Sequence, residues 1–474
     1  MAGAYRRGGG VLRDLYWSLI SLNHRGQQSH GFAILRGGIT RTVGLGPLPD
    51  EPPSDLQDGA VGVGHVRYAT SGGSSPEDLL RDAQPVIVGA RGRRLALAYN
   101  GNVANAVEIR RSLESSGFRT STGSDAELLA LELLRGLEGG GLRDAMLRLS
   151  ARVDGAYSIV GLTEDGTLFA ARDPNGIRPL FLGAADDLVL VASETVALDM
   201  VGVSRWDPVA PGELLVVRDG NVSRARYAPG RRERLCSFEY AYFARPDSVL
   251  GGRYVYEVRR ELGRRLAARY RDVAARVDVV APVPETAVDA AYGFHEASGK
   301  PMEMLVFKHR FVRARAFMST GALRPELIAR KYNVSRRAAG RRIALMDDSI
   351  VRGDTLRRLV AALRGVGAAE IHVFSTFPRI SHPCFYGVDM ATYGELIGFN
   401  RGPEEVAREL GADSVNYQDL DDFLDVVGRD SCVACVTGRY PTERASALAE
   451  VALRNPGIRS RITEAMGRWG GSSA

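Results

Sequence analysis

The feature that most constrains this chain is residues 342–355, RIALMDDSIVRGDT, where a short apolar run ends in two adjacent carboxylates. Ile343 to Met346 predict a buried strand, and the apolar spacing that resumes at Leu356 predicts the helix that follows. The loop between them consists of Ser349, Ile350, Val351, Arg352, Gly353, Asp354 and Thr355. Backbone N–H groups of such a loop converge beside a helix N-terminus, where a dianionic phosphate is favoured. The sequence therefore predicts a phosphate-binding loop.

The acid pair, Asp347 and Asp348, follows the predicted strand at its carboxyl end. There the two carboxylates are placed to accept hydrogen bonds from a ribose diol. A simpler explanation is that the pair caps a helix beside an ordinary loop, as most such pairs do. We favour a phosphosugar site because strand, acid pair, Ser, apolar pair, Gly and Thr follow in one uninterrupted order. No GxxxxGK[ST] sequence occurs in the chain, so a nucleoside triphosphate P-loop is excluded.

Length and composition indicate a globular protein of more than one domain. At 474 residues the chain should form two or more domains, and 45% of its residues are hydrophobic. No apolar run approaches the roughly 20 residues of a membrane helix, and no signal-peptide pattern opens the chain, so we expect a cytoplasmic protein without a membrane partner. The net charge of +6 is scattered among acids without a basic stripe, so nucleic acid is not an expected partner.

Two patterns of secondary structure divide the chain. Residues 1–230 alternate short β-rich runs with two helical patterns, which predicts an antiparallel, sheet-dominated α+β domain. Residues 231–442 alternate strands with helix-length segments, which predicts a parallel, doubly wound sheet that binds ligands at the carboxyl ends of its strands. Residues 443–474 predict a C-terminal helical tail of one or two amphipathic helices and a flexible end.

Several strings resemble the amidophosphoribosyltransferase family, and together they span roughly residues 2–442. The strings that resemble its N-terminal-nucleophile glutamine amidotransferase domain are HRGQQSHG (24–31), GHVRYATSG (64–72), YNGNVAN (99–105), SDAELL (124–129) and DPNGIRPL (173–180). CSFEYAYFARPDS (236–248) resembles the family's interdomain signature, and residues 342–355 resemble its phosphoribosyl pyrophosphate (PRPP) motif. The resemblance implies an αββα-sandwich glutaminase-like domain followed by an α/β type I phosphoribosyltransferase domain.

The resemblance also implies a glutamine site. The Asn100 side chain and the Gly101 N–H would form an oxyanion hole, for which paired donors are the requirement. Arg67 would pair with the α-carboxylate of glutamine, and Asp125 would accept from its α-ammonium group.

The start of the chain departs from the family, whose mature chain begins with Cys-Gly. In the family the thiol attacks the glutamine amide while the free α-amino group acts as the base. Aligning Gly3 with the family's glycine puts Ala2 at the position of the nucleophile, and no cysteine precedes Cys236. We therefore expect a site that binds glutamine without hydrolysing it.

In the PRPP site that the resemblance implies, Asp347 and Asp348 lie at the ribose and at Mg²⁺, and 349–355 hold the phosphate. One departure is Asp354, where the family usually has Thr. A carboxylate facing the phosphate would weaken binding unless it turns outward.

Two further segments would complete this site. PVPETA (282–287) corresponds to a pyrophosphate loop that usually ends Asp-Ser-Gly. Glu285 and Thr286 are related replacements, whereas Ala287 replaces a glycine whose freedom of φ often lets backbone approach a ligand. Residues 308–333 resemble the loop that closes over PRPP, and they bring Lys308 and Lys331 to the substrate.

The chain has four cysteines, Cys236, Cys384, Cys432 and Cys435. In a cytoplasmic protein this number favours a metal site over disulfides. All-thiolate coordination suits zinc or a four-iron cubane, and buried free thiols are the alternative. The strings around these cysteines resemble the cluster-binding members of the family, which implies a 4Fe-4S cluster.

The expected function is conversion of PRPP and glutamine-derived ammonia to 5-phosphoribosylamine, the first step of de novo purine synthesis. The family implies a homotetramer or homodimer inhibited by purine nucleotides. Two alternatives follow from the departures: an enzyme that uses ammonia beside a dead glutaminase site, and a non-catalytic paralogue that binds PRPP or nucleotides. A misassigned start codon or an engineered Cys→Ala change would also explain Ala2.

Overall fold

The computed structural model describes residues 1–68, 75–309, 331–390 and 392–457, and it divides into two compact units. The first unit takes in the described residues of Met1–Cys236, Cys384–Ala391 and Arg439–Ala474. The second takes in those of Ser237–Pro383 and Thr392–Gly438. The chain therefore returns to the first unit twice, whereas the sequence predicts three consecutive segments.

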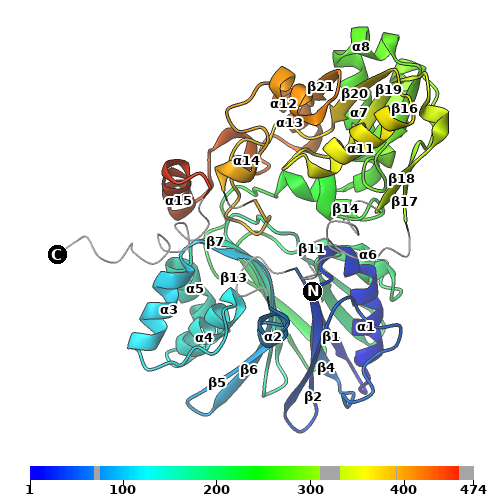
Figure 1. The fold of residues 1–474 in the computed structure, drawn as a ribbon. Helices are drawn as coiled ribbons and strands as arrows, with labels where there is room; N and C mark the ends of the chain where they lie inside the picture. The colour runs from blue at the N-terminus through cyan, green and yellow to red at the C-terminus, as the bar shows by residue number, and fades with distance from the viewer. Residues whose placement is uncertain (69–74, 310–330, 391, 458–474) are drawn as a thin grey trace. The chain divides into compact units, whose positions relative to one another are not determined.

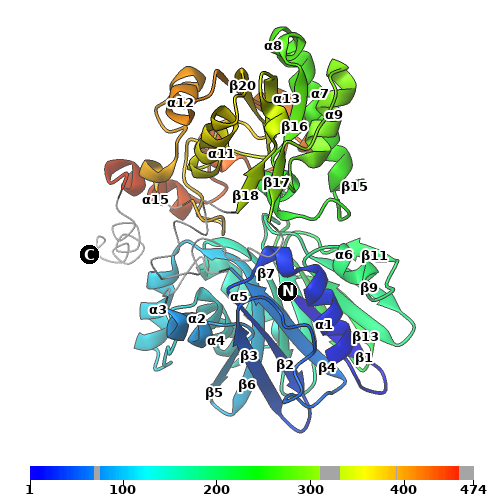
Figure 2. The ribbon, with the colours of Figure 1, turned by 45° about the vertical axis from the view of Figure 1, so that its right-hand side comes forward.

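The first unit is built on two antiparallel sheets (Figures 1 and 2). The seven-stranded sheet, in the order β11-β9-β10-β1-β4-β2-β3, contains β1 (Ala2–Arg6), β2 (Ser29–Leu35), β3 (Ile39–Leu45), β4 (Val61–Arg67), β9 (Phe181–Ala185), β10 (Leu188–Ala192) and β11 (Trp206–Pro208). The six-stranded sheet, in the order β13-β12-β8-β7-β6-β5, contains β5 (Val86–Ala90), β6 (Arg93–Val103), β7 (Gly155–Thr163), β8 (Leu168–Arg172), β12 (Glu213–Arg218) and β13 (Asn221–Arg226).

The two sheets pack face to face across a core of small and β-branched residues, including Ala33, Val63, Ala98 and Val160. Helices cover the outer faces, which makes the αββα sandwich that the sequence predicts. The helices of this unit are α1 (Leu12–Ser21) and α6 (Val196–Asp199) on the seven-stranded sheet, α3 (Ala106–Ser115), α4 (Asp125–Leu137) and α5 (Leu142–Arg152) on the six-stranded sheet, the short α2 (Pro76–Arg81), and α15 (Glu443–Arg454).

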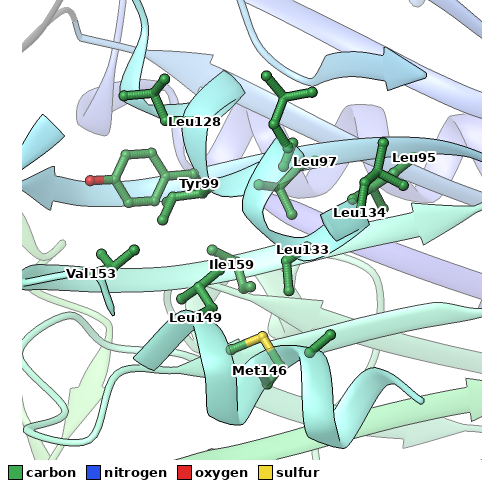
Figure 3. Packing of buried hydrophobic residues seen from close by; sticks show 14 of the residues in the cluster. Leu95, Leu97, Tyr99, Leu128, Leu133, Leu134, Met146, Leu149, Val153 and Ile159 are labelled. Carbon is green, nitrogen blue, oxygen red and sulfur yellow. The ribbon is translucent and has the colours of Figure 1, made fainter. Parts of the chain in front are cut away.

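Alternation along β6 explains how one strand serves two cores. Leu95, Leu97 and Tyr99 point to the helix side, where they pack with residues of α4 and α5 (Figure 3). Ala96 and Ala98 point to the other sheet. Successive side chains of a strand point to opposite faces, so the residue types along β6 fix which face meets which layer.

The second unit is a doubly wound α/β fold. Its parallel sheet, in the order β16-β19-β20-β21, consists of β16 (Val279–Pro282), β19 (Arg342–Asp347), β20 (Glu370–Ser375) and β21 (Ser414–Tyr417). Around it lie α7 (Val255–Arg269), α8 (Arg271–Arg276), α9 (Val288–Ser298), α11 (Asp354–Gly365), α12 (Pro403–Leu410), α13 (Leu420–Val427) and α14 (Ala434–Thr437). Two short antiparallel pairs join β14 (Val249–Leu250) with β15 (Arg253–Tyr254) and β17 (Val306–Lys308) with β18 (Tyr332–Val334).

Strand β19 is buried on both faces, as its continuous apolar run predicts. Ile343 and Leu345 pack in the core that includes α11 and α12, and Ala344 and Met346 pack in the core that includes α7 and α9. Both parts of the predicted fold class, the sandwich and the parallel α/β domain, are thus confirmed. No helix in the part of the chain that the structure describes is long and apolar enough to cross a membrane.

Candidate active sites in the two units

The acid pair lies at the carboxyl edge of the parallel sheet of the second unit. Asp347 is the last residue of β19, and both carboxylates are buried, with Asp347 8% and Asp348 7% exposed. Ser349 Oγ donates to Asp348 Oδ1 at 2.6 Å, and Thr286 Oγ1 donates to Asp348 Oδ2. The structure therefore brings the acid pair together with the loop after β16, as the sequence predicts.

The two carboxylates perturb each other. Burial raises the pKa of Asp347 well above its ordinary value, and the neighbouring charge of Asp348 raises it further. Burial also raises the pKa of Asp348, while hydrogen bonds from Ser349 and Thr286 lower it. Adjacent buried carboxylates of this kind are stabilised by a cation or by hydroxyl donors, so the pair suits Mg²⁺ and a ribose diol.

The loop after the acid pair is held in one conformation by glycine. Gly353 has φ +78°, and a Cβ added there would lie 2.6 Å from Ile397 Cδ1. The Ile397 N–H donates to Val351 O at 2.9 Å, and Ile350 is buried. Only glycine fits the turn into α11, so the loop's backbone is presented at the N-terminus of that helix.

The polar residues of this loop divide into paired and exposed groups. Arg352 Nε donates to Glu395 Oε2 at 3.0 Å, which holds this guanidinium in an ion pair. Ser349 Oγ donates to Asp348 Oδ1, and Thr355 is exposed. Both remain candidates for contacts with a phosphate.

Asp354 is turned toward its own helix. Arg357 Nη1 donates to Asp354 Oδ1 at 3.0 Å, and the Asp354 side chain is 65% exposed. Arg357 also pairs with Glu409 Oε1 at 2.9 Å. The carboxylate that replaces the family's Thr is thus neutralised by a guanidinium, and the aspartate suits the first turn of a helix.

Ala287 adopts an ordinary backbone conformation. Its φ is −86° and its ψ is −2°, so this position does not require glycine. Its neighbour Glu285 is exposed, with Lys308 Nζ 3.8 Å from Glu285 Oε2. The replacement of glycine by Ala287 therefore causes no backbone strain.

The two predicted lysines lie on the β17–β18 pair, where Lys308 is opposite Tyr332 and Lys331 precedes Tyr332. Lys331 Nζ lies 5.1 Å from the centroid of the Tyr332 ring. Residues 310–330 of the predicted closing loop lie outside the described residues.

Sequence reasoning missed Tyr332. Burial raises the pKa of Tyr332, and the charges of Asp347 and Asp348 raise it further, which places its hydroxyl in the field of the acid pair. Its position directly after Lys331 was the signal in the sequence.

In the first unit, β6 carries the predicted oxyanion pair. Gly101 has φ +154°, and a Cβ there would lie 1.9 Å from Ala156 O, so only glycine fits. Among the described residues, the buried Asn100 Nδ2 has no hydrogen-bond partner. A buried donor without a partner is costly, so this amide is available to a ligand.

Arg67 and Asp125 also come together in this unit. Arg67, at the end of β4, is 3% exposed. Burial lowers the pKa of Arg67, and the charges of Asp82 and Asp125 oppose that shift. Tyr99 Oη donates to Asp125 Oδ2 at 3.0 Å. Asp82, fully buried, is a further acid of this cluster that the sequence did not signal.

Ala2 is fully buried in β1, between Ala192 of β10 and Gly64 of β4. A Cβ added at Gly64 would lie 2.6 Å from Leu19 Cδ1 of α1. Directly paired residues share a face of the sheet, so Ala2 faces α1. The structure does not bring Ala2 onto the face that looks toward β6.

Within the described residues the four cysteines form no disulfide, and they divide equally between the units. Cys236 and Cys384 belong to the first unit and Cys432 and Cys435 to the second. Four thiols are a donor set that suits a cubane cluster. Within the described ranges, no group of three or more His, Cys, Asp or Glu side chains is arranged to hold a metal ion.

Together these features define a class: an αββα sandwich of the glutamine amidotransferase type, joined to a phosphoribosyltransferase-type sheet with its acid pair and phosphate loop. A family model described as a glutamine amidotransferase domain matches residues 73–200. The chain is 38% identical to an amidophosphoribosyltransferase of Bacillus subtilis, over 90% of this chain and 91% of the relative. It is 39% identical to one of Methanothermobacter thermautotrophicus, over 93% of each chain.

A solved structure agrees with these relatives. The glutamine PRPP amidotransferase of B. subtilis, complexed with ADP and GMP, matches with a TM-score of 0.84 and 37% identity, over 94% of this chain and 97% of the other. The chain belongs to the amidophosphoribosyltransferase family, whose members are pentosyltransferases.

Proposed function

We propose that this protein transfers ammonia to PRPP with release of pyrophosphate, which forms 5-phosphoribosylamine for purine biosynthesis, and that glutamine is not its nitrogen donor. The observation that supports the transfer to PRPP is the Asp348 carboxylate at the carboxyl edge of the sheet. Ser349 and Thr286, which belong to two different loops, donate hydrogen bonds to it. The proposal that glutamine is not the donor rests on Ala2, the residue that aligns with the family's nucleophile, because its methyl group is neither a thiol nor a hydroxyl.

The residues of the second unit account for binding. The backbone of 349–355 at the N-terminus of α11 holds the 5′-phosphate, and Asp347 and Asp348 accept from the ribose hydroxyls. Thr286 and the two lysines, Lys308 and Lys331, would bind the pyrophosphate.

These groups also account for the reaction. The bond from C1 to the pyrophosphate oxygen breaks as the ammonia lone pair forms the new C1–N bond, and the ammonium product then loses a proton. Positive charge that develops on the ribose ring lies beside two carboxylates, which stabilise it. Mg²⁺ bound at the acid pair would supply positive charge to the departing pyrophosphate.

The cysteines support a 4Fe-4S cluster as a structural cofactor. Its thiolate ligands would be Cys236, Cys384, Cys432 and Cys435.

Two of the three sequence departures that favoured a non-catalytic protein, Asp354 and Ala287, have a structural explanation. Arg357 offsets part of the Asp354 charge, and Ala287 has an unstrained backbone, so neither departure prevents PRPP binding. Purine nucleotides as inhibitors are supported by the relative solved with ADP and GMP. A homotetramer or homodimer stays a prediction.

The test is pyrophosphate release from PRPP and Mg²⁺ with ammonium chloride as the nitrogen source. We expect release that rises with pH, because only unprotonated ammonia attacks. PRPP binding without pyrophosphate release at any pH would leave the non-catalytic binder, and absence of binding would remove both functions.

A further inference from the structure

The antiparallel pair of β17 and β18 carries Tyr332 on its inner face. Lys308 lies directly opposite Tyr332, and residues directly opposite each other in an antiparallel pair share a face. Val306, two residues before Lys308, is buried in the core of the second unit. The other face is turned to solvent, because Phe307 is 48% exposed and the residue opposite it, Asn333, is also exposed. Alternation along both strands therefore directs the tyrosine ring inward.

Two contacts bring this inner face to the loops that hold the acid pair. The Nζ atom of the lysine opposite Tyr332 lies 3.8 Å from Glu285 Oε2. The residue after Glu285 is Thr286, which donates to the Asp348 carboxylate. Tyr332 itself packs against the core that contains Ile350, from the loop after β19. The pair of short strands thus reaches both loops whose hydroxyls hold Asp348.

The tyrosine hydroxyl lies in the electric field of the acid pair. Burial raises the pKa of Tyr332, and the charges of Asp347 and Asp348 raise it further. A phenol beside carboxylates keeps its proton, so this hydroxyl acts as a hydrogen-bond donor. The Lys331 ammonium lies 5.1 Å from the centroid of the ring, and its charge opposes the rise in the pKa of Asp347. The ring therefore also supports a cation that faces this carboxylate.

Asp347 is the member of the acid pair that a further donor would complete. The Asp348 carboxylate accepts from two hydroxyls, whereas the Asp347 carboxylate accepts the Asp348 N–H and, among the described residues, no hydroxyl. A carboxylate that binds a sugar hydroxyl accepts the proton of that hydroxyl. The oxygen of the same hydroxyl is then left to accept from a second donor, and Tyr332 is a donor on the correct side of Asp347.

We infer that Tyr332 determines the sugar specificity of the site by donating to the 2-hydroxyl oxygen of the ribose, while Asp347 accepts the proton of that hydroxyl. The 2-hydroxyl is the group concerned because C2 adjoins C1, which carries the pyrophosphate. Tyr332 lies beside Lys308 and Lys331, the two lysines assigned to that pyrophosphate. The ligand class is thus a ribose 5-phosphate and not a 2-deoxyribose 5-phosphate. This inference rests on the proposed function and adds a specificity to the same site.

The test is Tyr332→Phe, which removes the hydroxyl and keeps the ring beside Lys331. Titration calorimetry with Mg²⁺ measures the dissociation constants of PRPP, ribose 5-phosphate and 2-deoxyribose 5-phosphate. We expect PRPP and ribose 5-phosphate to bind roughly three- to tenfold more weakly to the variant, the usual effect of losing one hydrogen bond. The 2-deoxyribose 5-phosphate should bind equally well to the variant and the wild type, because it lacks the hydroxyl that Tyr332 contacts.

A control and a second variant separate recognition from a structural role. Tyr292→Phe removes the hydroxyl of a tyrosine that is 48% exposed on α9, and it should leave all three dissociation constants unchanged. Tyr332→Leu, which also removes the ring, should lose the same preference for ribose over 2-deoxyribose. Thermal unfolding verifies that each variant is folded.

The outcomes distinguish this inference from the proposed function. Equal weakening of both sugar phosphates in the Tyr332 variants would show a structural role and overturn the inference, as would an unchanged affinity for ribose 5-phosphate. A wild type that binds PRPP but neither sugar phosphate would also overturn it, because the ribose hydroxyls would then contribute no recognition of their own. A wild type that does not bind PRPP would instead remove the proposed function.

Discussion

The acid pair shows how single residues set the chemistry of the second unit. Both oxygens of the Asp348 carboxylate accept from hydroxyls, one from the loop of β19 and one from the loop of β16. Among the described residues no hydroxyl donates to the Asp347 carboxylate, whose Oδ1 accepts the Asp348 N–H at 3.0 Å. The two neighbours are therefore unequal, with Asp348 as the anchored member.

Replacing Asp348 by Asn should weaken PRPP binding in the presence of Mg²⁺. A hydrogen bond to a charged group contributes about 1.5–3 kcal/mol, so the dissociation constant should rise roughly tenfold or more. Titration calorimetry measures it. Asp278→Asn is the matched control, because Asp278 pairs with Arg342 at the opposite, amino end of β19. Equal losses in the two variants would contradict a role for Asp348 in the site.

Replacing Asp354 by Thr should have opposite effects on binding and stability. Removing a carboxylate near the phosphate should tighten PRPP binding, up to roughly fivefold for an exposed charge. Losing an acid from the first turn of α11 should lower the free energy of unfolding by about 0.3–1 kcal/mol. Calorimetry and chemical denaturation measure the two changes, and the binding gain should shrink at high salt. Weaker PRPP binding would show that the carboxylate serves the site.

The sequence predicted most readily those site residues that lie close together in the chain. Asp347, Asp348 and Gly353 fall in one string, so their position at one edge of the sheet was predictable. Thr286 was assigned to the site only through the family resemblance, whereas Tyr332 and Asp82, which reach their sites from distant segments, were missed. The sequence assigned the nucleophile's position to Ala2 because Gly3 was aligned with the family's glycine. The pairing of β1 with β4 determines which face of the sheet each residue takes.

At the scale of elements, the turn into α11 and the packing of strand β1 each depend on one glycine. Gly353 takes a left-handed φ where the loop approaches Ile397, and Gly3 lets β1 approach β7. The apolar runs predicted β19 and its burial on both faces. The side of β1 that meets the other sheet was not predictable, because Met-Ala-Gly-Ala has no alternation of polar and apolar residues.

Replacing Gly353 by Ala should disrupt the phosphate loop. A left-handed conformation costs a non-glycine residue about 1–2 kcal/mol, and the added methyl group would meet Ile397. We expect a comparable loss in the free energy of unfolding and a loss of PRPP binding. Gly365→Ala is the control, since Gly365 ends α11 in open space and without a positive φ. That variant should keep PRPP binding and gain up to about 1 kcal/mol of stability. Full PRPP affinity in Gly353→Ala would contradict the account of the loop.

At the scale of the whole molecule, the chain does not fold as consecutive segments. The described residues of Cys384–Ala391 and Arg439–Ala474 join the first unit. Within that unit Asn102 Nδ2 donates to Phe385 O at 3.0 Å, and the Arg444 N–H donates to Asp154 Oδ2 at 3.3 Å. Sequence periodicity distinguished the antiparallel domain from the parallel one. It could not show that these two later segments join the first unit, because that depends on contacts between residues far apart in the chain.

The four cysteines give a further prediction. Protein purified without oxygen should be brown and contain iron and sulfide near four per chain, as a cubane requires. Cys432→Ser should bleach it and lower its unfolding temperature, because one thiolate ligand of the cluster is lost. Iron and sulfide analysis with visible absorption measures this. Stoichiometric zinc in colourless protein made under iron-replete, anaerobic conditions would contradict the cluster.

The central claim, that ammonia and not glutamine supplies the nitrogen, is tested most directly by isotope competition. The protein, with its N-terminus verified by mass, is given PRPP, Mg²⁺, ¹⁵N-ammonium and unlabelled glutamine together. The phosphoribosylamine is trapped by borohydride reduction, and its mass is measured. We expect ¹⁵N in the trapped amine and no accompanying glutamate. Unlabelled amine, formed with an equal amount of glutamate, would contradict the account.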